Sequence, residues 1–309
     1  MKRPDEMGCL AGRRVVITGA GRGLGAAYAE HAAACGAMVV VNDIDADMAA
    51  AVANRICRSG GEAVADDNSV AEVDGAAALI ERCVTTFGGL DGLVNNAGLF
   101  HLVPTPGEVP QRVRELMDVN VLGPLWCGVA AIPHLQAAGG GAIVNVTSGA
   151  HLGIAGMAAY GASKGAVASL TYCWAAELAA DNIRVNAVSP VAGTRMTAAM
   201  AAGATASIAA PNEVAALVSY LLSDLADFSG SVIRLSSDGL GAIIGPRPSP
   251  QVVTDTVWTV DTVHAAVSTL LAADPQIRTP PRSPGSLQRA DDLPGPPGPP
   301  CPSPPEESS

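Results

Sequence analysis

The chain is poor in lysine, in aromatic side chains and in charge. Of its 309 residues only 15% are charged and 3% are aromatic, and the formal net charge is −11. Sixteen of the 18 basic residues are scattered arginines, so no basic stripe is present to follow a phosphate backbone. So few aromatic rings also leave little surface on which bases could stack. Both shortages argue against a nucleic-acid-binding protein.

Long apolar runs and patterned cysteines are missing as well. No apolar run approaches the roughly 18–20 residues that cross a bilayer, and the first ten residues contain no apolar signal segment. The seven cysteines are widely spaced without a CxxC pair, and the five histidines form no HxxH or HExxH pair. We therefore expect a cytoplasmic protein without a membrane span, a disulfide framework or a metal site.

Proline is concentrated at one end of the chain. The last 35 residues contain 12 of the 23 prolines, and proline removes backbone donors and fixes φ, which prevents regular helix and sheet. We expect a flexible N-terminus over residues 1–9, one folded domain over residues 10–274 and a disordered proline-rich tail over residues 275–309.

Upstream of the tail, short β-branched runs alternate with alanine-rich stretches of helical length. Strands are expected at Arg14–Thr18, Met38–Asn42, Gly92–Asn95, Ala142–Thr147, Arg184–Val188 and Ser231–Leu235, and helices at Gly25–Cys35, Ala46–Ser59, Asp74–Thr86, Ala159–Ala180 and Pro211–Ser223. Strands that are apolar on both faces and separated by helices indicate a parallel sheet covered on both sides. The predicted fold class is α/β, a single Rossmann-like domain with a doubly wound parallel sheet.

A glycine cluster follows the first expected strand and opens the first expected helix. Glycines let the backbone turn tightly and approach a pyrophosphate, toward which the helix directs its N-terminal N–H groups. A plain turn would need glycine too, but the order strand, glycines, helix favours nucleotide binding. The residues expected to contact the cofactor here are Gly19, Arg22, Gly23, Leu24 and Gly25.

An aspartate follows the second expected strand. Asp43 lies about 20 residues beyond the glycines, where a carboxylate can accept hydrogen bonds from both hydroxyls of an adenosine ribose. The same charge would repel a 2′-phosphate, and no arginine follows Asp43 immediately, so NAD is favoured over NADP. The alternative role for a carboxylate at this point is to cap the next helix.

The single lysine away from the N-terminus lies one helical turn after a tyrosine. Tyr160 and Lys164 are four residues apart and therefore share one face of an expected helix. The ammonium would favour phenolate and lower the pKa of the phenol. Tyr160 would then take the proton of a substrate alcohol, help that is typically worth about 10²–10⁴-fold in rate. Such a pair also occurs by chance, but a chain that otherwise uses arginine makes this lysine harder to dismiss.

The spacing TGxxxGxG, the sequence NNAG and the YxxxK pair, in this order, resemble the short-chain dehydrogenase/reductase family over about residues 10–245. The resemblance implies an NAD-dependent enzyme that interconverts secondary alcohols and ketones, with Asn120, Ser148, Tyr160 and Lys164 as its catalytic residues. Ser148 would bind the substrate oxygen. Thr147 is the alternative, because it lies 13 residues before the tyrosine, the family's usual spacing, whereas Ser148 lies 12 before it. Asn120 would support a proton relay, or would simply bond to the backbone.

The resemblance also implies further contacts and partners. The additional cofactor-binding residues would be Asn68, Ser69, Asn95, Ala97, Gly98, Val191 and Thr194, together with Tyr160 and Lys164. The stretch Ser189–Thr197 resembles the dehydrogenase unit of peroxisomal multifunctional enzymes, which implies a 3-hydroxyacyl-CoA substrate, although the family's usual Pro-Gly is here Pro190-Val191. A homodimer or homotetramer is implied as well.

The substrate itself is expected to be a small apolar alcohol or ketone. Its site would be lined by His101, Leu102, Leu152, Ile154, Met157 and the segment Met196–Ala210, for each of which plain packing is the alternative. Two other functions stay open. One is an NADPH-dependent ketoreductase of carrier-bound or polyketide-like substrates, which Asp43 disfavours. The other is a non-catalytic nucleotide-binding scaffold, which a broken set of catalytic residues would indicate.

Overall fold

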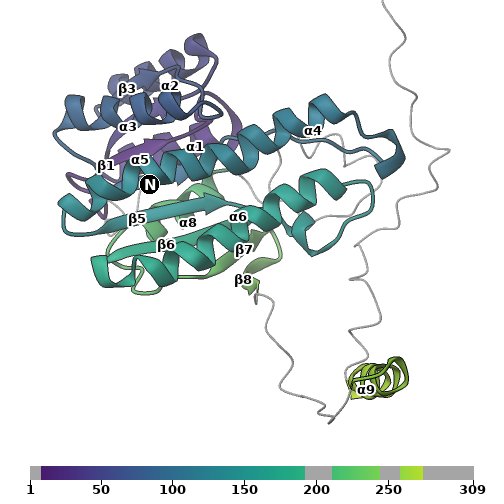
Figure 1. Ribbon diagram of the computed structural model, residues 1–309. Helices are drawn as coiled ribbons and strands as arrows, with labels where there is room; N and C mark the ends of the chain where they lie inside the picture. The colour runs from purple at the N-terminus through teal and green to yellow at the C-terminus, as the bar shows by residue number, and fades with distance from the viewer. Residues whose placement is uncertain (1–7, 192–210, 244–257, 274–309) are drawn as a thin grey trace, which may run out of the picture.

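An eight-stranded sheet runs through the centre of the molecule (Figure 1). The computed structural model describes residues 8–191, 211–243 and 258–273. The strand order is β3-β2-β1-β4-β5-β6-β7-β8. The strands are β1 (Arg14–Ile17), β2 (Met38–Asn42), β3 (Glu62–Asp66), β4 (Gly92–Asn95), β5 (Gly141–Val146), β6 (Ile183–Pro190), β7 (Val232–Ser236) and β8 (Gly239–Ile243). Every neighbouring pair is parallel except β7 with β8, which is antiparallel.

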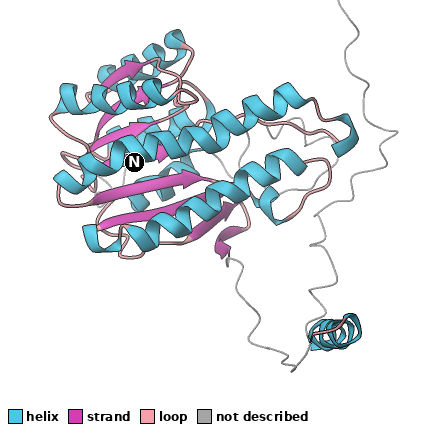
Figure 2. Cartoon of the chain, viewed as in Figure 1, coloured by secondary structure: helices cyan, strands magenta, loops and turns pink. Residues whose placement is uncertain are grey.

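Helices cover both faces of the sheet (Figure 2). The α-helices of the described residues are α1 (Gly23–Ala34), α2 (Ala46–Arg58), α3 (Val73–Phe87), α4 (Pro110–Met117), α5 (Gly123–Ala137), α6 (Ala158–Glu177), α8 (Pro211–Leu222) and α9 (Val260–Ala273). Side chains of α1, α2 and α8 pack on one face, and those of α3, α5 and α6 on the other. A π turn, η3 (Asp118–Leu122), joins α4 to α5 in one continuous helical stretch.

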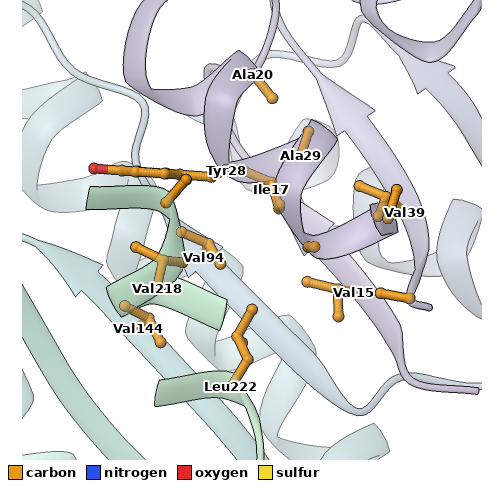
Figure 3. Close-up of a cluster of buried hydrophobic side chains, with 14 of the residues drawn as sticks. Val15, Ile17, Ala20, Tyr28, Ala29, Val39, Val94, Val144, Val218 and Leu222 are labelled. Atoms are coloured by element: carbon orange, nitrogen blue, oxygen red, sulfur yellow. The ribbon is translucent and has the colours of Figure 1, made fainter. Parts of the chain in front are cut away.

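Consecutive apolar residues of a strand pack on opposite faces of the sheet, which explains this two-sided packing. Val15 and Ile17 lie in the cluster that contains α1 and α8, whereas Val16, between them, lies in the cluster on the other face. Figure 3 shows Val15, Ile17 and Tyr28 among the residues of the first cluster. Successive side chains of a strand point to opposite faces, so a strand buried on both sides must be apolar throughout. Burying one such side chain contributes roughly 1.5–3 kcal/mol.

The predicted doubly wound α/β fold is confirmed. All six expected strands and all five expected helices are present, each with ends within three residues of the prediction. β3 and β8 were not expected from the sequence, and the expectation of a wholly parallel sheet is corrected by β8, which pairs antiparallel with β7. β3 begins and ends with an acidic residue, and β8 has glycine at two of five positions, so neither shows the apolar run that marked the other strands.

One helical stretch corrects the expectation that no segment is apolar enough to cross a membrane. By length and composition alone, Pro110–Ala137 meets that criterion. In the structure its α5 part is a core helix, because Cys127, Ala131 and Leu135 are fully buried on the sheet face that α5 shares with α3. Helices that cover a doubly wound sheet are apolar for this reason.

Several predictions fall outside the described residues. These are Thr194, the segment 196–210 and the proline-rich tail 275–309. α9 is described, and Figure 1 shows it apart from the sheet and its covering helices. The proposed boundaries at residues 9 and 274 stay predictions.

Candidate active site

The glycine loop between β1 and α1 is packed so closely that side chains do not fit. Gly19 has a φ of +61°, and a Cβ added to it would lie 2.7 Å from the Cα of Ala97. A Cβ on Gly25 would lie 2.2 Å from the carbonyl oxygen of Gly19. Arg22 and Gly23 are exposed and Leu24 half-buried, at the point where α1 begins. The loop therefore offers bare backbone and the N-terminus of a helix, which is what a pyrophosphate requires.

The NNAG segment holds this loop in place. The amide of Asn96 donates to the carbonyl oxygens of Thr18 and Gly19, at 2.9 and 3.0 Å. In return, the Thr18 hydroxyl oxygen accepts hydrogen bonds from the backbone N–H groups of Asn96 and Ala97, each at 3.0 Å. These hydrogen bonds of Thr18 and of the Asn96 side chain were not expected from the sequence. The position of Thr18 between the first strand and the glycines was the sequence feature that could have predicted such a role.

Asp43 lies against the glycine loop and is buried. Its Oδ2 accepts a hydrogen bond from the Gly21 N–H at 3.0 Å, and its Oδ1 accepts one from the Asp45 N–H at 3.1 Å. Capping of α2 belongs to Asp45 instead, whose carboxylate accepts from the Met48 N–H. A carboxylate fixed beside a backbone-only turn fits the adenosine end of a dinucleotide.

The end of β3 adds an acidic residue that was not expected. Asp66 accepts hydrogen bonds from the side-chain amides of Asn42 and Asn68, at 2.9 and 2.8 Å, and from the backbone N–H of Asn68 at 3.0 Å. Asn68 and the following Ser69 thus come to the edge where Asp43 lies, but the Asn68 amide is directed toward Asp66. Asp66 was missed because β3 was missed.

Asn95 has a structural partner on the neighbouring strand. Its amide donates to Oδ1 of Asn145 on β5 at 2.9 Å, and the Asn145 amide donates to the Thr171 hydroxyl of α6 at 3.0 Å. This buried network ties β4, β5 and α6 together. Contact of Asn95 with a cofactor stays a prediction.

Tyr160 and Lys164 lie on the first turns of α6, as the YxxxK spacing predicts, and both are buried. The Ser148 hydroxyl lies beside the Tyr160 phenol, close enough to lower its pKa. The Tyr160 ring meets the Phe100 ring edge to face, with centroids 5.0 Å apart. The Lys164 Nζ lies 5.9 Å from the centre of the Tyr160 ring and donates a hydrogen bond to the Val146 carbonyl oxygen at 2.9 Å.

Burial governs the pKa values of this pair. Burial raises the pKa of Tyr160 above its ordinary value, and the hydrogen bond to Ser148 partly opposes that shift. Burial lowers the pKa of Lys164 to about 8, because a low-dielectric environment disfavours the charged amine. The expectation that Lys164 lowers the pKa of the phenol is thus not met in this structure, where desolvation of the phenol dominates.

The structure separates the roles of Thr147 and Ser148. The Thr147 hydroxyl is buried and donates to the backbone carbonyl oxygen of Lys164 at 2.8 Å, so it faces α6. The Ser148 hydroxyl lies beside the Tyr160 phenol, and its Oγ accepts a hydrogen bond from the Ala150 N–H at 3.2 Å. Of the two hydroxyls, Ser148 is therefore the one placed beside the phenol.

Asn120 lies in the π turn η3 and is fully buried. Its amide group pairs with both backbone groups of Leu99, at 2.7 and 2.9 Å, and donates to the Ser163 hydroxyl at 3.1 Å. Ser163 in turn donates to the Tyr160 carbonyl oxygen at 2.7 Å. A Cβ on Gly98 would lie 3.3 Å from Asn120 Oδ1 and 3.5 Å from Lys164 Nζ. Asn120 thus makes the hydrogen bonds to the backbone that its alternative, structural role predicts. It also lies in a π turn, a feature that is common at functional sites.

An apolar cluster surrounds Tyr160. Its buried members are Leu116, Ala150, Met157 and Tyr160, and Phe100, Leu102, Met117 and Ile154 pack against it half-buried. The predicted lining residues Leu102, Ile154 and Met157 therefore gather here, and Phe100, Leu116 and Met117 are additions. Leu152 is exposed, and the Nδ1 atom of His101 is buried without a hydrogen-bond partner.

The Val191 N–H donates to the Leu235 carbonyl oxygen, which joins the end of β6 to β7.

Known proteins match both the sequence and this geometry. The family profile described as short chain dehydrogenase matches residues 13–205. A cis-4-hydroxycyclohexanecarboxylate dehydrogenase of Sinomonas cyclohexanicum is 39% identical over 247 residues, which are 76% of this chain and 98% of the relative. A peroxisomal hydratase-dehydrogenase-epimerase of Saccharomyces cerevisiae is 34% identical over 250 residues, which are 78% of this chain and 28% of that longer protein.

Solved structures agree. A short chain dehydrogenase from Mycobacterium avium superposes with a TM-score of 0.77 at 37% identity, and the match covers 86% of this chain and 96% of that one. A gluconate 5-dehydrogenase from Burkholderia cenocepacia in complex with NADP and tartrate gives a TM-score of 0.69 at 31% identity, covering 74% and 95%. A 7 alpha-hydroxysteroid dehydrogenase complexed with NADH gives 0.68 at 30% identity, covering 77% and 98%. The chain belongs to the short-chain dehydrogenase family, whose members bind a nicotinamide cofactor, and it is an oxidoreductase that acts on CH–OH groups.

Proposed function

We propose that the protein is an NAD-dependent dehydrogenase that interconverts an apolar secondary alcohol and its ketone. The observation that carries this proposal is the buried Tyr160 phenol, which lies beside the Ser148 hydroxyl and one helical turn before Lys164. A buried phenol paired with a second hydroxyl can exchange a proton with a substrate oxygen that is held between them.

Each of the four candidate catalytic residues would have its own role in the reaction. Ser148 holds the substrate oxygen by a hydrogen bond, and Tyr160 removes the hydroxyl proton in the oxidation direction or returns it in the reduction direction. Lys164 supplies an amine that binds the nicotinamide ribose. Asn120 fixes the turn of α6 through Ser163. The nicotinamide supplies the hydride chemistry when bound.

Asp43 supports NAD as the cofactor. Its carboxylate is buried and held by the backbone of Gly21 and Asp45, so it cannot easily turn away. Ribose hydroxyls can donate to such a carboxylate, whereas a 2′-phosphate would bring a second negative charge to within a few ångströms of it. Gly19, Arg22, Gly23, Leu24 and Gly25 would hold the pyrophosphate.

The apolar cluster around Tyr160 supports an apolar carbon skeleton for the substrate. Phe100, Leu102 and Met157 surround the phenol without a charged side chain among them. Two substrate classes have support from relatives. A hydroxylated cyclohexane ring agrees with the name of the Sinomonas enzyme. A 3-hydroxyacyl thioester is what the resemblance of the stretch Ser189–Thr197 implies, and the chain is also similar to a peroxisomal hydratase-dehydrogenase-epimerase.

The test is a cofactor and substrate panel on purified protein. Short and long 3-hydroxyacyl-CoA esters, cyclohexanol and 4-hydroxycyclohexanecarboxylate are each incubated with NAD and with NADP, and reduced-cofactor absorbance is followed. We expect turnover with NAD that Tyr160→Phe reduces by about 10²–10⁴-fold. Unchanged turnover in Tyr160→Phe contradicts the mechanism. NADP binding tighter than NAD would instead support a ketoreductase, and cofactor binding without turnover on any substrate would support a scaffold.

We further propose that the protein forms a homodimer or homotetramer in the cytoplasm. Val129 on α5 is an exposed apolar side chain and Cys173 on α6 is exposed as well, so these two neighbouring helices present an uncovered face. Light scattering on the eluted protein gives the subunit number. A monomer at micromolar concentration contradicts this part of the proposal.

A further inference from the structure

A polar cavity lies at the amino edge of the sheet, at the opposite end of the strands from Tyr160. It has a volume of about 190 Å³. Its walls come from residues at the amino ends of β1, β4, β5 and β6 and from the turn after α8, namely Arg13, Asp91, Ala138, Gly139, Gly140, Gly141, Asn182, Arg184 and Asp224. Ala138 is the only apolar side chain among them, so the cavity suits a polar ligand.

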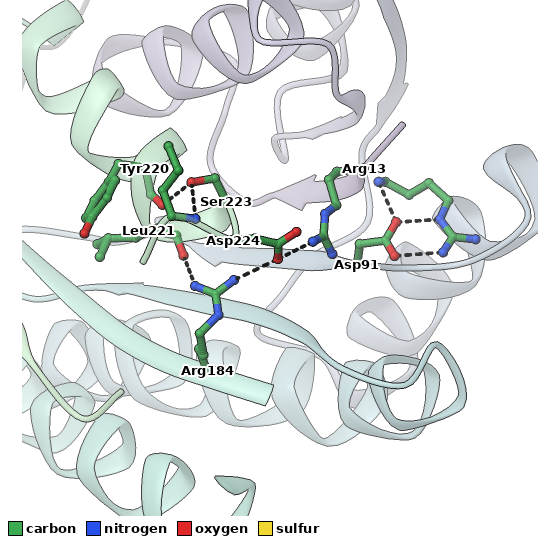
Figure 4. Close-up of polar contacts among 9 residues, drawn as sticks. Arg13, Asp91, Arg184, Tyr220, Leu221, Ser223 and Asp224 are labelled. Carbon is green, nitrogen blue, oxygen red and sulfur yellow. Dashed lines mark hydrogen bonds and ion pairs between the residues drawn. The ribbon is translucent and has the colours of Figure 1, made fainter. Parts of the chain in front are cut away.

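Two arginines of this cavity share one carboxylate. Arg13 and Arg184 both form ion pairs with Oδ1 of Asp224, the second at 3.9 Å (Figure 4). The side chain of Asp224 is 82% exposed, whereas those of Arg13 and Arg184 are only 26% and 19% exposed. Within the described part of the chain, no other carboxylate lies at ion-pair distance from either guanidinium. Two half-buried guanidinium groups, those of Arg13 and Arg184, therefore share one carboxylate, that of the largely exposed Asp224.

The nearby Asp91 attracts Arg13 electrostatically, but its hydrogen bonds go to Arg14. Arg14 holds it with two side-chain hydrogen bonds, at 2.6 and 2.8 Å, and the Arg14 backbone N–H adds a third at 2.9 Å. Three arginines and two aspartates therefore meet at this edge, with one positive charge in excess.

The guanidinium groups also have more donors than partners. Arg184 donates one hydrogen bond to the Leu221 carbonyl oxygen at 3.0 Å (Figure 4). Each guanidinium carries five N–H donors in a planar fork that matches the oxygens of a carboxylate or phosphate. Burial lowers the pKa of Arg184, Asp224 opposes this shift, and the neighbouring Arg13 adds to it. The charge on Arg184 is therefore incompletely compensated by its surroundings, and a further anion would relieve both burial and repulsion.

We propose that this amino-edge cavity binds a small free oxyanion of the phosphate class, held between Arg13 and Arg184. The three glycines in its wall, Gly139 to Gly141, leave room for the ligand, and the volume exceeds what one water molecule needs. Bound oxyanion would join β1, β6 and the turn after α8, and would stabilise the fold from the edge opposite the catalytic residues.

The experiment measures thermal melting in increasing inorganic phosphate, with sodium chloride at equal ionic strength as the reference. We expect phosphate to raise the melting temperature beyond the chloride effect. Arg13→Gln and Arg184→Gln should each weaken the apparent phosphate affinity by about tenfold or more, because each substitution removes a charge-assisted hydrogen bond to the anion. Asp224→Asn strengthens it severalfold, because the competing carboxylate is gone. Arg112→Gln, which removes an exposed arginine of α4, leaves it unchanged.

Phosphate could also bind at the glycine loop, and the variants separate the two places. Loss of the response in Arg22→Gln, with the response retained in Arg13→Gln, overturns the proposal. An unchanged affinity in Asp224→Asn overturns it as well. If Arg184→Gln does not fold, Arg184→Lys keeps the charge but lacks the fork, and it should show weakened binding.

Discussion

Thr147 donates its hydroxyl hydrogen bond to the backbone carbonyl oxygen of Lys164 at 2.8 Å, and this contact ties the end of β5 to the part of α6 that carries Tyr160 and Lys164. The hydroxyl of the next residue, Ser148, lies beside the Tyr160 phenol instead. Two adjacent hydroxyls thus serve different purposes. The first joins the strand to the helix, and the second is the one that we propose binds the substrate oxygen.

Paired alanine substitutions should separate these two purposes. We expect Ser148→Ala to lower kcat by about 10²-fold, the typical effect of removing one donor to the reacting oxygen, with little change in stability. Thr147→Ala should lower the free energy of unfolding by about 1 kcal/mol, because a buried hydrogen bond is lost. Thr147→Ser keeps the hydroxyl and serves as the control. Steady-state kinetics and urea denaturation provide both readouts, and a larger kcat loss in Thr147→Ala than in Ser148→Ala would reverse the assignment.

Cofactor preference should follow Asp43. Replacing Asp43 with Asn removes the negative charge but keeps the shape, so we expect the ratio of kcat/KM for NAD over NADP to fall by about tenfold or more. Asp45→Asn is the matched control, since Asp45 caps α2 and lies two residues away. It should leave the ratio unchanged. Equal ratios in the parent protein and Asp43→Asn would show that Asp43 does not select the cofactor.

The close packing of the glycine loop can be tested by adding a Cβ atom at a single glycine. A Cβ on Gly25 would approach the Gly19 carbonyl oxygen to 2.2 Å and the Asn96 amide to 2.5 Å, so backbone must move. We expect Gly25→Ala to weaken cofactor binding strongly and to destabilise the protein by about 1–3 kcal/mol. Gly241→Ala, on β8, meets nothing within 4 Å and should be nearly neutral. Calorimetric titration with NAD and thermal melting measure the two effects. Tight NAD binding by Gly25→Ala would contradict the close packing of the loop.

Much of the fold follows from local pattern. The apolar runs of β1 and β2 and the amphipathic face of α2 are fixed by residues close together in sequence, and their positions were predicted within one residue. β3 was missed because its burial comes from pairing with β2 and not from its own residues. α5 was missed because it is apolar around its circumference, which leaves no helical period to detect.

The site was predictable where a motif is contiguous. The Tyr160–Lys164 spacing and the glycine loop lie within single segments, and the structure places them as expected. Contacts between distant segments were not predictable. The hydrogen bonds of Asn96 to the Thr18 and Gly19 carbonyls, and the edge contact of Phe100 with Tyr160, join residues that only the finished sheet brings together.

The buried amine of Lys164 should leave a signature in the pH dependence of stability. Burial lowers its pKa from an ordinary 10.5 to about 8. Below pH 8 the amine is protonated in both the folded and the unfolded state. Between about 8 and 10.5 the unfolded state keeps the proton that the folded state has lost, so the unfolded state binds more protons. The contribution of Lys164 to the free energy of unfolding therefore rises with pH in this window, by at most about 1.4 kcal/mol per pH unit.

A neutral side chain of similar length removes this contribution, so the measurement compares the parent protein with Lys164→Met. Burial raises the pKa of the Cys83 and Cys127 thiols to about 12, which makes stability fall above pH 9, but both proteins share this effect and it cancels in the difference. Urea denaturation at intervals from pH 7 to pH 9.5 gives the two curves. We expect the parent to gain stability relative to Lys164→Met above pH 8. Parallel curves over the whole range would mean that the amine titrates near its ordinary pKa, and that the buried environment of Lys164 is not as the structure shows it.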